Sequence, residues 1–502
     1  MRVAILGLDG IPFDFIISLA RTGHMPNIRK VLNNGVYGIL WSTVPSISPV
    51  AWASMATGLN PGKHGIFGFV DRYFRPYSSR NIMGKSIWDI ASRAGKTITC
   101  LNVPFTYPAY PIRGIMISGP PSPREQIDAY PSEIIGELEA LGYKLDLDIP
   151  NEEYRGLKEA DFMKQAEEIT RIRAEALLML MDNVQWDLLY AVFTTPDRVQ
   201  HVFFGRAIES SPFYALRDRM ILIRYYELLD EIIGKVLAAL PGDTIMMLVS
   251  DHGFEPLYKY IGLHNILAEF VVKKGPLRML YEMPMRLLGK INLMSLARRT
   301  LIRLGIAGET RRLIGGGFEC SLNYIYCSSE RLRKRLDEIV RFLSLVTDKE
   351  NGLRIFDKVH RREELFYGPF LKDAPDIILV PVSGYEPKAI LPEKFMKIKL
   401  TRGVTSKTGT HMSSKARRGF FAMVGDGVIE GRRLDISIYD VAPTALHILD
   451  LPVPEDVDGD VLVQAFEKKS SVARRRVRIF KRSRREDLIP KIRKVRERLK
   501  RN

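Results

Sequence analysis

Asp251 and His252 stand side by side in the stretch VSDHGF, directly after the apolar run TIMMLV. Such a run is typical of a buried strand. Burying a carboxylate and an imidazole at the end of such a strand costs free energy unless a bound partner replaces the water that they lose. The pair therefore points to a bound ligand, and other polar residues in the same kind of position become candidates for the same site.

Four further residues fit that description. Asp9 ends the first apolar run in GLDG, Asp197 follows LLYAVF in the stretch PDRVQH, and His411 lies in the loop KTGTHMS. His201 comes four residues after Asp197, a spacing that places both on one face of a helix. Each residue alone is ordinary, since an Asp after a strand is usually a turn or cap residue. Together, three carboxylates and three imidazoles suit zinc or manganese, and with one hydroxyl they would suffice for two ions.

Ser48 is the candidate for that hydroxyl. The stretch SPVAWASMATG predicts a helix that begins at Ser48, has Pro49 in its first turn and ends at Gly58. Ser48 could be only the helix cap. A hydroxyl at a helix N-terminus, however, faces free N–H groups that can hold phosphate, and it can serve as a nucleophile when a metal activates it. Ser46 and Thr43 are alternatives, but neither precedes a helix start.

The elements that must position these residues alternate along the chain. Apolar strands such as VAILGLD, TITCLNV and TIMMLV are separated by helical patterns such as LIRYYELLDEIIGKVLAAL. This alternation predicts an α/β domain with a mostly parallel sheet. In such sheets ligands bind at the carboxyl ends of the strands, where the candidate residues lie.

Composition agrees with a large globular domain. The 502 residues are 46% hydrophobic and 26% charged, and no apolar stretch reaches the 18 residues typical of a membrane-spanning helix. The N-terminus reads as a strand and not as a signal peptide. Three cysteines, Cys100, Cys320 and Cys327, follow no metal-ligand spacing. We therefore expect a cytoplasmic protein.

The net charge of +17 is concentrated in two segments. Residues 468–502 carry +14 and residues 273–312 carry +8, which leaves −5 for the rest of the chain. We predict a catalytic domain over 1–467, with 273–312 as a basic amphipathic helical insertion and 468–502 as a basic tail. The insertion could pack on the body, cover the site, or lie on an anionic membrane; the tail could aid solubility or attract anionic lipid or nucleic acid. Peripheral membrane association follows as an option, and the oligomeric state stays open.

The ordered set Asp9, SPVAWASMATGLNPGKHGI, PDRVQH, SDHGF and GTHMS resembles the alkaline phosphatase superfamily, in particular its type I phosphodiesterase and nucleotide pyrophosphatase branch. The resemblance covers most of residues 1–465. It implies a doubly wound α/β fold with helices on both faces of the sheet and two metal ions, usually zinc. One ion would be held by Asp9, Ser48, Asp251 and His252, and the other by Asp197, His201 and His411.

The same resemblance implies hydrolysis of a phosphate ester or nucleotide-like substrate, in which Ser48 attacks phosphorus and water releases the phospho-enzyme. Nucleotide pyrophosphatases carry an Asn shortly after HGI, where this chain has Phe69. Arg72, Asn102 and His264 are the candidates for substrate contacts. The sulfatase signature is absent. A phosphomonoesterase, a phosphomutase, or a catalytically silent basic protein that binds membranes or nucleic acid are the alternatives.

Overall fold

The computed structural model describes residues 1–482 apart from several segments, namely 74, 123–125, 148–153, 155, 264–265, 268–269, 271–317 and 389–406, and it does not describe 483–502. The predicted insertion 273–312 and the candidate residue His264 therefore lie outside the described residues. So does the second half of the predicted tail.

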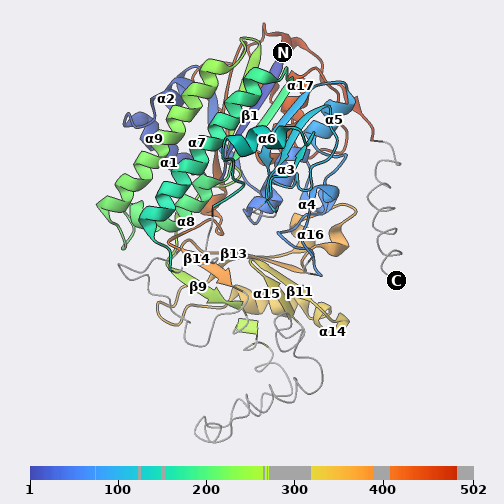
Figure 1. Cartoon of the computed structure of the whole chain (residues 1–502). Helices are drawn as coiled ribbons and strands as arrows, with labels where there is room; N and C mark the ends of the chain where they lie inside the picture. The colour runs from blue at the N-terminus through green and yellow to red at the C-terminus, as the bar shows by residue number, and fades with distance from the viewer. Residues whose placement is uncertain are drawn as a thin grey trace, which may run out of the picture.

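A ten-stranded sheet forms the centre of the molecule (Figure 1). Its strands, in spatial order, are β17 (Arg432–Arg433), β2 (Gly35–Trp41), β16 (Arg418–Val424), β7 (Thr244–Val249), β1 (Arg2–Leu8), β6 (Leu188–Phe193), β3 (Ile98–Val103), β4 (Gly114–Ser118) and β5 (Ala129–Tyr130), with β18 (Ile436–Ser437) also paired to β2. The strands β7, β1, β6, β3 and β4 are mutually parallel, and Ile5 of β1 pairs with Tyr190 and Met247 on its two sides. Strand β16 is antiparallel to its neighbours.

Helices cover both faces of this sheet because its central strands are apolar on both sides. Leu6 of β1 contributes to one buried cluster and Ile5 to another. One face carries α1 (Phe13–Arg21), α2 (Pro26–Asn33), α6 (Ile134–Ala140), α7 (Glu159–Asn183), α8 (Thr195–Ala207) and α9 (Leu216–Ala239), and the other carries α3 (Ser48–Thr57), α5 (Ile87–Arg93) and α17 (Val441–Ile448). The arrangement confirms the predicted doubly wound α/β fold.

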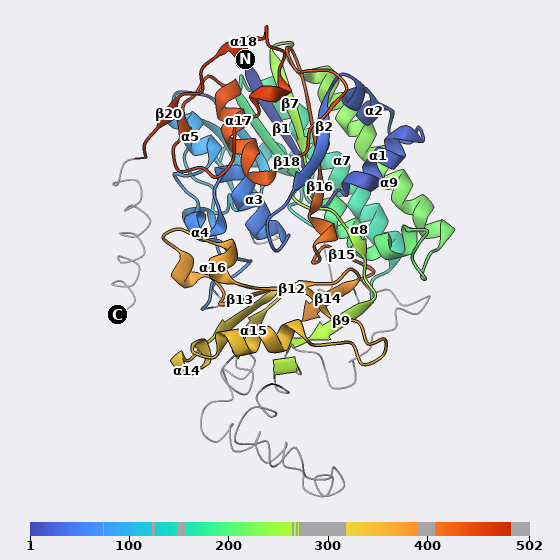
Figure 2. The same cartoon turned by 180° about the vertical axis from the view of Figure 1, so that it is seen from behind.

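A second, smaller sheet lies beyond one end of the central sheet (Figures 1 and 2). Its strands are β10 (Phe318–Ser321), β11 (Tyr324–Cys327), β13 (Ile377–Pro381) and β12 (Phe356–Arg361), and α14 (Glu330–Arg333), α15 (Leu336–Ser344), α16 (Arg362–Leu365) and the strand pair β9 (Lys259–Gly262) with β14 (Tyr385–Lys388) accompany it. We call residues 318–388 the small subdomain. It has its own apolar cluster, to which Ile325, Ile339 and Leu379 belong.

The small subdomain also packs against the central domain at the start of α3. Ile47 and Val50, which flank Ser48, belong to the same buried cluster as Tyr324 and Phe366 of the small subdomain. A shared apolar cluster fixes the two parts relative to each other. The start of α3 therefore lies where the two sheets meet.

The first part of the predicted tail is packed on the body. Val472, in α18 (Ser471–Arg474), is fully buried, and β20 (Ile479–Phe480) pairs with β19 (Val453–Pro454). Arg475 donates to the carbonyls of His447 and Ile448 at the end of α17. Residues 468–482 hold eight of the 17 basic residues of that tail, so part of its charge lies on a segment that packs on the body. Among the described residues, the helices are all too short or too polar to cross a membrane.

Candidate metal-dependent active site

The six predicted ligands from strand ends and loops converge at one edge of the central sheet. Asp9 follows β1, Asp251 follows β7, and α8, which carries Asp197, starts directly after β6. His411 follows the short strand β15 (Gly409–Thr410), which pairs with β8 (Glu255–Pro256) just after His252. All six side chains are buried. Sequence segments more than 400 residues apart thus meet at the carboxyl ends of parallel strands.

The ligands fall into two adjacent clusters. In each, one ligand atom per residue lies within 4.8 Å of the others; the first cluster is Asp9, Asp251 and His252, and the second is Asp197, His201 and His411. The rings of His252 and His411 stack with centroids 3.8 Å apart, so the clusters share a border. The Ser48 hydroxyl lies 3.1 Å from Nε2 of His252. All seven predicted residues are therefore brought together.

Ser48 occupies the N-terminal end of α3. The helix runs from Ser48 to Thr57, with Pro49 in its first turn, and Gly58 ends it in the left-handed region at φ 67°. Ile47 takes the cap position, so Ser48 is the first helical residue and not the cap that the sequence suggested. This one-residue difference keeps its hydroxyl at the electropositive end of the helix, where an anion is favoured.

Backbone carbonyls orient all three imidazoles in the same way. The Nδ1 atoms of His201, His252 and His411 lie 3.0, 3.0 and 2.8 Å from the carbonyl oxygens of Gly409, Gly253 and Ser46. A carbonyl only accepts, so each Nδ1 carries the proton and each Nε2 is left with a lone pair. This pattern is typical of metal-ligating histidines.

The three carboxylates are each held by one oxygen only. The donors are the Trp52 indole N–H to Asp9 Oδ2 at 3.2 Å, the Gly10 N–H to Asp251 Oδ1 at 3.1 Å, and the Arg198 guanidinium to Asp197 Oδ2 at 3.0 Å. The second oxygens, Asp9 Oδ1, Asp197 Oδ1 and Asp251 Oδ2, are buried and accept no hydrogen bond from the described residues. A buried carboxylate oxygen without a donor is costly unless a cation meets it.

The pKa shifts follow from this crowding. Burial, with repulsion from Asp251 and Asp197, raises the pKa of Asp9 well above its usual value. Burial, opposed by the Gly10 N–H and reinforced by Asp197, raises the pKa of Asp251 to about 7. Burial would also raise the pKa of Asp197, but the Arg198 guanidinium beside it holds the pKa below its usual value. Like charges forced together out of water call for cations between them.

The imidazoles shift in the sense that metal binding requires. Burial lowers the pKa of His201 and of His411 well below the usual value, and the nearby ammonium of Lys407 lowers both further. Both rings are therefore neutral, and only a neutral imidazole can offer a lone pair. Three orphaned carboxylate oxygens and the Nε2 atoms of the three rings form a donor set that fits divalent metal ions.

Several residues that support the site were not predicted. The ring of Phe254 packs against His201, His411 and His252 with centroid separations of 4.8, 5.4 and 5.9 Å. Trp52 and Arg198 each hold one oxygen of a ligand carboxylate. Phe254 and Arg198 lie within the motifs SDHGF and PDRVQH, and a cation directly after a candidate ligand Asp was a signal for Arg198. No sequence signal links Trp52 to Asp9.

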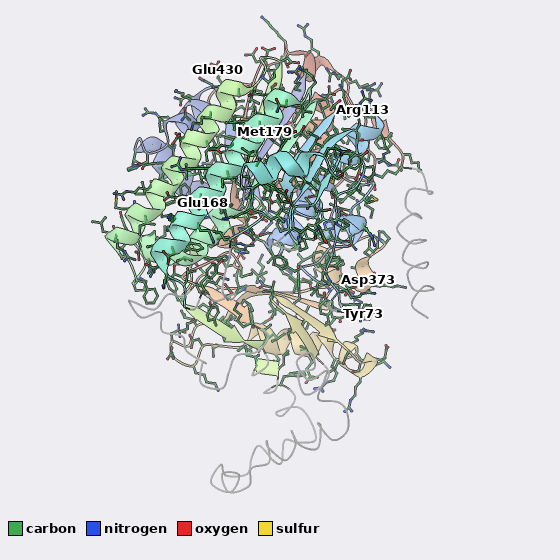
Figure 3. All side chains as sticks on the ribbon, in the orientation of Figure 1. Tyr73, Arg113, Glu168, Met179, Asp373 and Glu430 are labelled. Atoms are coloured by element: carbon green, nitrogen blue, oxygen red, sulfur yellow. The ribbon has the colours of Figure 1, made fainter. Side chains whose placement is uncertain are left out.

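The candidates for substrate contacts are placed less favourably. Asn102 is fully buried, and its amide donates to Val192 O and Thr194 Oγ1, so it supports the start of α8. Arg72 donates to Lys372 O at 3.3 Å on the small subdomain. Figure 3 shows the neighbouring residue Tyr73 beside the smaller sheet, at the periphery of the molecule. Phe69, at the position of the expected Asn, is 49% exposed.

Comparisons with known proteins agree with this geometry. The family model for type I phosphodiesterase / nucleotide pyrophosphatase matches residues 3–389. Murine ectonucleotide pyrophosphatase/phosphodiesterase 5 is 14% identical, with 92% of this chain and 98% of that chain covered and a TM-score of 0.53; an inactive variant of it in complex with AMP aligns equally well, with 97% of that chain covered. The human counterpart is 13% identical, with 93% and 98% covered and a TM-score of 0.53. No curated protein matches the chain by sequence.

Proposed function

Because the chain belongs to the type I phosphodiesterase / nucleotide pyrophosphatase family and is a phosphoric ester hydrolase, we propose that it cleaves phosphodiesters with a serine nucleophile and two bound metal ions. The observation that carries this proposal is the pair of buried ligand clusters beside the Ser48 hydroxyl. The three buried carboxylate oxygens without a donor at this edge of the sheet also support it.

The two clusters divide the ligands as the family resemblance implies. Asp9, Asp251 and His252, with Ser48, would hold one ion, and Asp197, His201 and His411 would hold the other. Mixed nitrogen and oxygen donors favour zinc and also accept manganese. When bound, the two ions would lower the pKa of the serine hydroxyl and polarise the phosphate oxygens.

Ser48 would carry out the first chemical step. Its Oγ would form a bond to phosphorus while the bond from phosphorus to one ester oxygen breaks. That oxygen leaves as an alcohol or nucleoside after taking up the proton that the serine hydroxyl gives up, and the serine stays esterified to the remaining phosphate monoester. The N-terminus of α3 stabilises the negative charge on the phosphoryl group during this step. A water molecule would then attack phosphorus from the side opposite Ser48, which breaks the bond from phosphorus to Oγ, releases a phosphomonoester and restores the serine hydroxyl.

We propose a nucleotide-like diester as the substrate class. The family description and the AMP complex of the murine structural neighbour support a nucleotide. The test compares hydrolysis of bis(p-nitrophenyl) phosphate and of p-nitrophenyl phosphate after loading with zinc or manganese. Faster turnover of the diester supports the proposal. Faster turnover of the monoester would favour the phosphomonoesterase alternative instead.

Replacing Ser48 tests the covalent mechanism. Ser48→Ala should leave both ions bound, because the six other ligands remain, and should lower kcat by roughly 10³-fold or more. Metal content by mass spectrometry and steady-state rates measure the two effects. Asp251→Asn is the comparison, since it should lower metal content as well as rate. Near-normal activity of Ser48→Ala would show that water is the direct nucleophile.

The location and surface partners of the chain are further proposals. The three cysteines are unpaired and buried, which supports a cytoplasmic location. We propose that the basic residues of 273–312 and 468–502 attract an anionic membrane surface or nucleic acid, supported by their charge alone.

A further inference from the structure

Arg198 joins the candidate site to a carboxylate outside it. Its Nη1 donates to Asp197 Oδ2 at 3.0 Å, and its Nη2 donates to Asp146 Oδ2 at 3.1 Å. The side chain of Asp197 is 4% exposed and that of Asp146 is 10% exposed, whereas 27% of the Arg198 side chain remains exposed. The guanidinium thus bridges two nearly buried carboxylates, only one of which is a predicted ligand.

The bridge decides which Asp197 oxygen is free. Oδ2 is engaged by Arg198, and Oδ1 is left 3.5 Å from Nε2 of His201 and 3.9 Å from Nε2 of His411. We propose that Arg198 is a positioning residue that fixes Asp197 as a one-oxygen ligand of the ion held with His201 and His411. The inference rests on the metal site of the proposed function and adds a determinant of its affinity.

Asp146 is needed for this role because a lone guanidinium could rotate with its carboxylate. Arginine presents its N–H donors in a rigid planar fork, and two carboxylates at two different Nη atoms fix that plane. Asp146 is itself anchored by the N–H of Leu147, which donates to its other oxygen at 2.9 Å. When the outer partner that orients a ligand is removed, the affinity of the site for its metal typically falls 10- to 100-fold.

Charge and positioning make opposite predictions. A positive charge beside a divalent ion repels it, so if Arg198 acted only through its charge, its loss would tighten metal binding. If it acts by positioning, its loss weakens binding, because Asp197 can turn its free oxygen away. The sign of the change in affinity therefore separates the two roles.

The same helix offers a matched control. Arg206, near the end of α8, bridges Glu159 and Asp218 with its Nη2 2.7 Å from Glu159 Oε1 and its Nε 3.0 Å from Asp218 Oδ2. Its side chain is 11% exposed, and neither partner is a predicted ligand. Replacing it should lower stability as much as replacing Arg198 or more, without reaching the metal clusters.

The experiment measures zinc binding by the full-length protein in competition with a chromophoric chelator. Wild type and Arg206→Gln should bind two ions alike, and Arg198→Gln should retain one ion unchanged and bind the other 10- to 100-fold more weakly. Arg198→Lys keeps the charge but cannot form the fork, so it should show the same loss; it also serves if Arg198→Gln does not fold. Thermal melting of the metal-free variants checks the fold.

Three results would overturn the inference. Equal or tighter binding of the second ion by both Arg198 variants would show that Arg198 does not position Asp197, while the proposed function would stand. A wild-type chain that binds neither zinc nor manganese would remove the metal site itself and the inference with it. A weaker second site in Arg206→Gln to the same degree would assign the effect to general loss of stability, which also contradicts the inference.

Discussion

At the scale of single residues, the surroundings of each candidate ligand leave only one of its oxygen or nitrogen atoms free to bind a metal. Each ligand carboxylate has one oxygen occupied by a donor of the protein, and each ligand imidazole has its Nδ1 occupied by a carbonyl. The remaining carboxylate oxygens and the Nε2 atoms lie close together within the two clusters. Rigid outer contacts of this kind lower the reorganisation that binding requires.

His64, outside the site, provides a pH-dependent test of the fold. Its Nδ1 accepts from the N–H of Ile66 at 3.1 Å, so its Nε2 carries the proton and donates to Ser54 at 3.0 Å. Burial, together with the positive charge of the neighbouring Lys85, lowers the pKa of His64 to about 3. As the pH falls below about 6.5, His64 becomes protonated in the unfolded chain but stays neutral in the folded chain. The contribution of neutral His64 to the unfolding free energy is therefore fully present above that pH and is lost progressively down to about pH 3.

His64→Gln should reduce this loss. Between pH 7 and pH 5, the unfolding free energy of the wild type should fall by roughly 2 kcal/mol more than that of the variant. Urea unfolding of both metal-free proteins at the two pH values measures the difference. Equal losses in both proteins would show that His64 is not buried as a neutral ring.

At the scale of elements, the strand ends were predictable and the contacts between distant loops were not. Asp9 and Asp251 follow uninterrupted apolar runs, so their place at one edge of a parallel sheet follows from the period of the sequence. The small subdomain escaped prediction because its strands are short and β12 is half exposed, which leaves little alternation to detect. The bridge from Arg198 to Asp146 spans 52 positions and depends on a loop whose path no local pattern encodes.

Strand β14 provides a second contact between segments that are distant in the sequence. Its Glu386 is buried and accepts from Lys407 Nζ at 2.9 Å and from Thr410 Oγ1 at 2.7 Å. Lys407 and Thr410 belong to the segment that ends in the predicted ligand His411. The small subdomain therefore helps to hold one of the two ligand clusters.

Glu386→Gln should expose this dependence. It leaves the buried Lys407 ammonium without its counter-charge, so the unfolding free energy should fall by about 3–5 kcal/mol. Zinc binding at the cluster with His411 should weaken as well. The control is Glu364→Gln, which removes an exposed partner of His360 and should cost less than about 1 kcal/mol. Equal stability of the two variants in urea would contradict the role of Glu386.

At the scale of the whole molecule, the chain wraps its own C-terminal segment around the core. Val472 is fully buried, and Arg475 donates to the last carbonyls of α17. Basic residues in 468–482 thus help to hold the C-terminal segment on the core, besides contributing to the net charge. The sequence pattern could not separate these from the basic residues of 483–502, because both stretches are equally rich in arginine.

Truncation distinguishes the two stretches. Removal of 483–502 should leave the melting temperature and the turnover of a small soluble diester unchanged, and it should weaken any binding to anionic vesicles or nucleic acid that falls with added salt. Removal of 468–502 also removes Val472, so it should cost at least ~2 kcal/mol of unfolding free energy. Differential scanning calorimetry and vesicle sedimentation measure these effects. A normal melting temperature after the longer truncation would contradict the packing of 468–482.

The fluorescence of Trp52 can report on the first of the two clusters. Its indole N–H is hydrogen-bonded to Asp9, whose other oxygen faces the first cluster, while Trp88, whose N–H donates to Tyr110 at 2.7 Å, lies elsewhere in the same core. A cation that draws electron density from the Asp9 carboxylate weakens the hydrogen bond to the indole. The emission of Trp52 should therefore shift as the first cluster fills, and the other three tryptophans, Trp41, Trp88 and Trp186, should supply a constant background. The protein thus carries an intrinsic optical probe that should respond to metal binding at the first cluster more strongly than at the second.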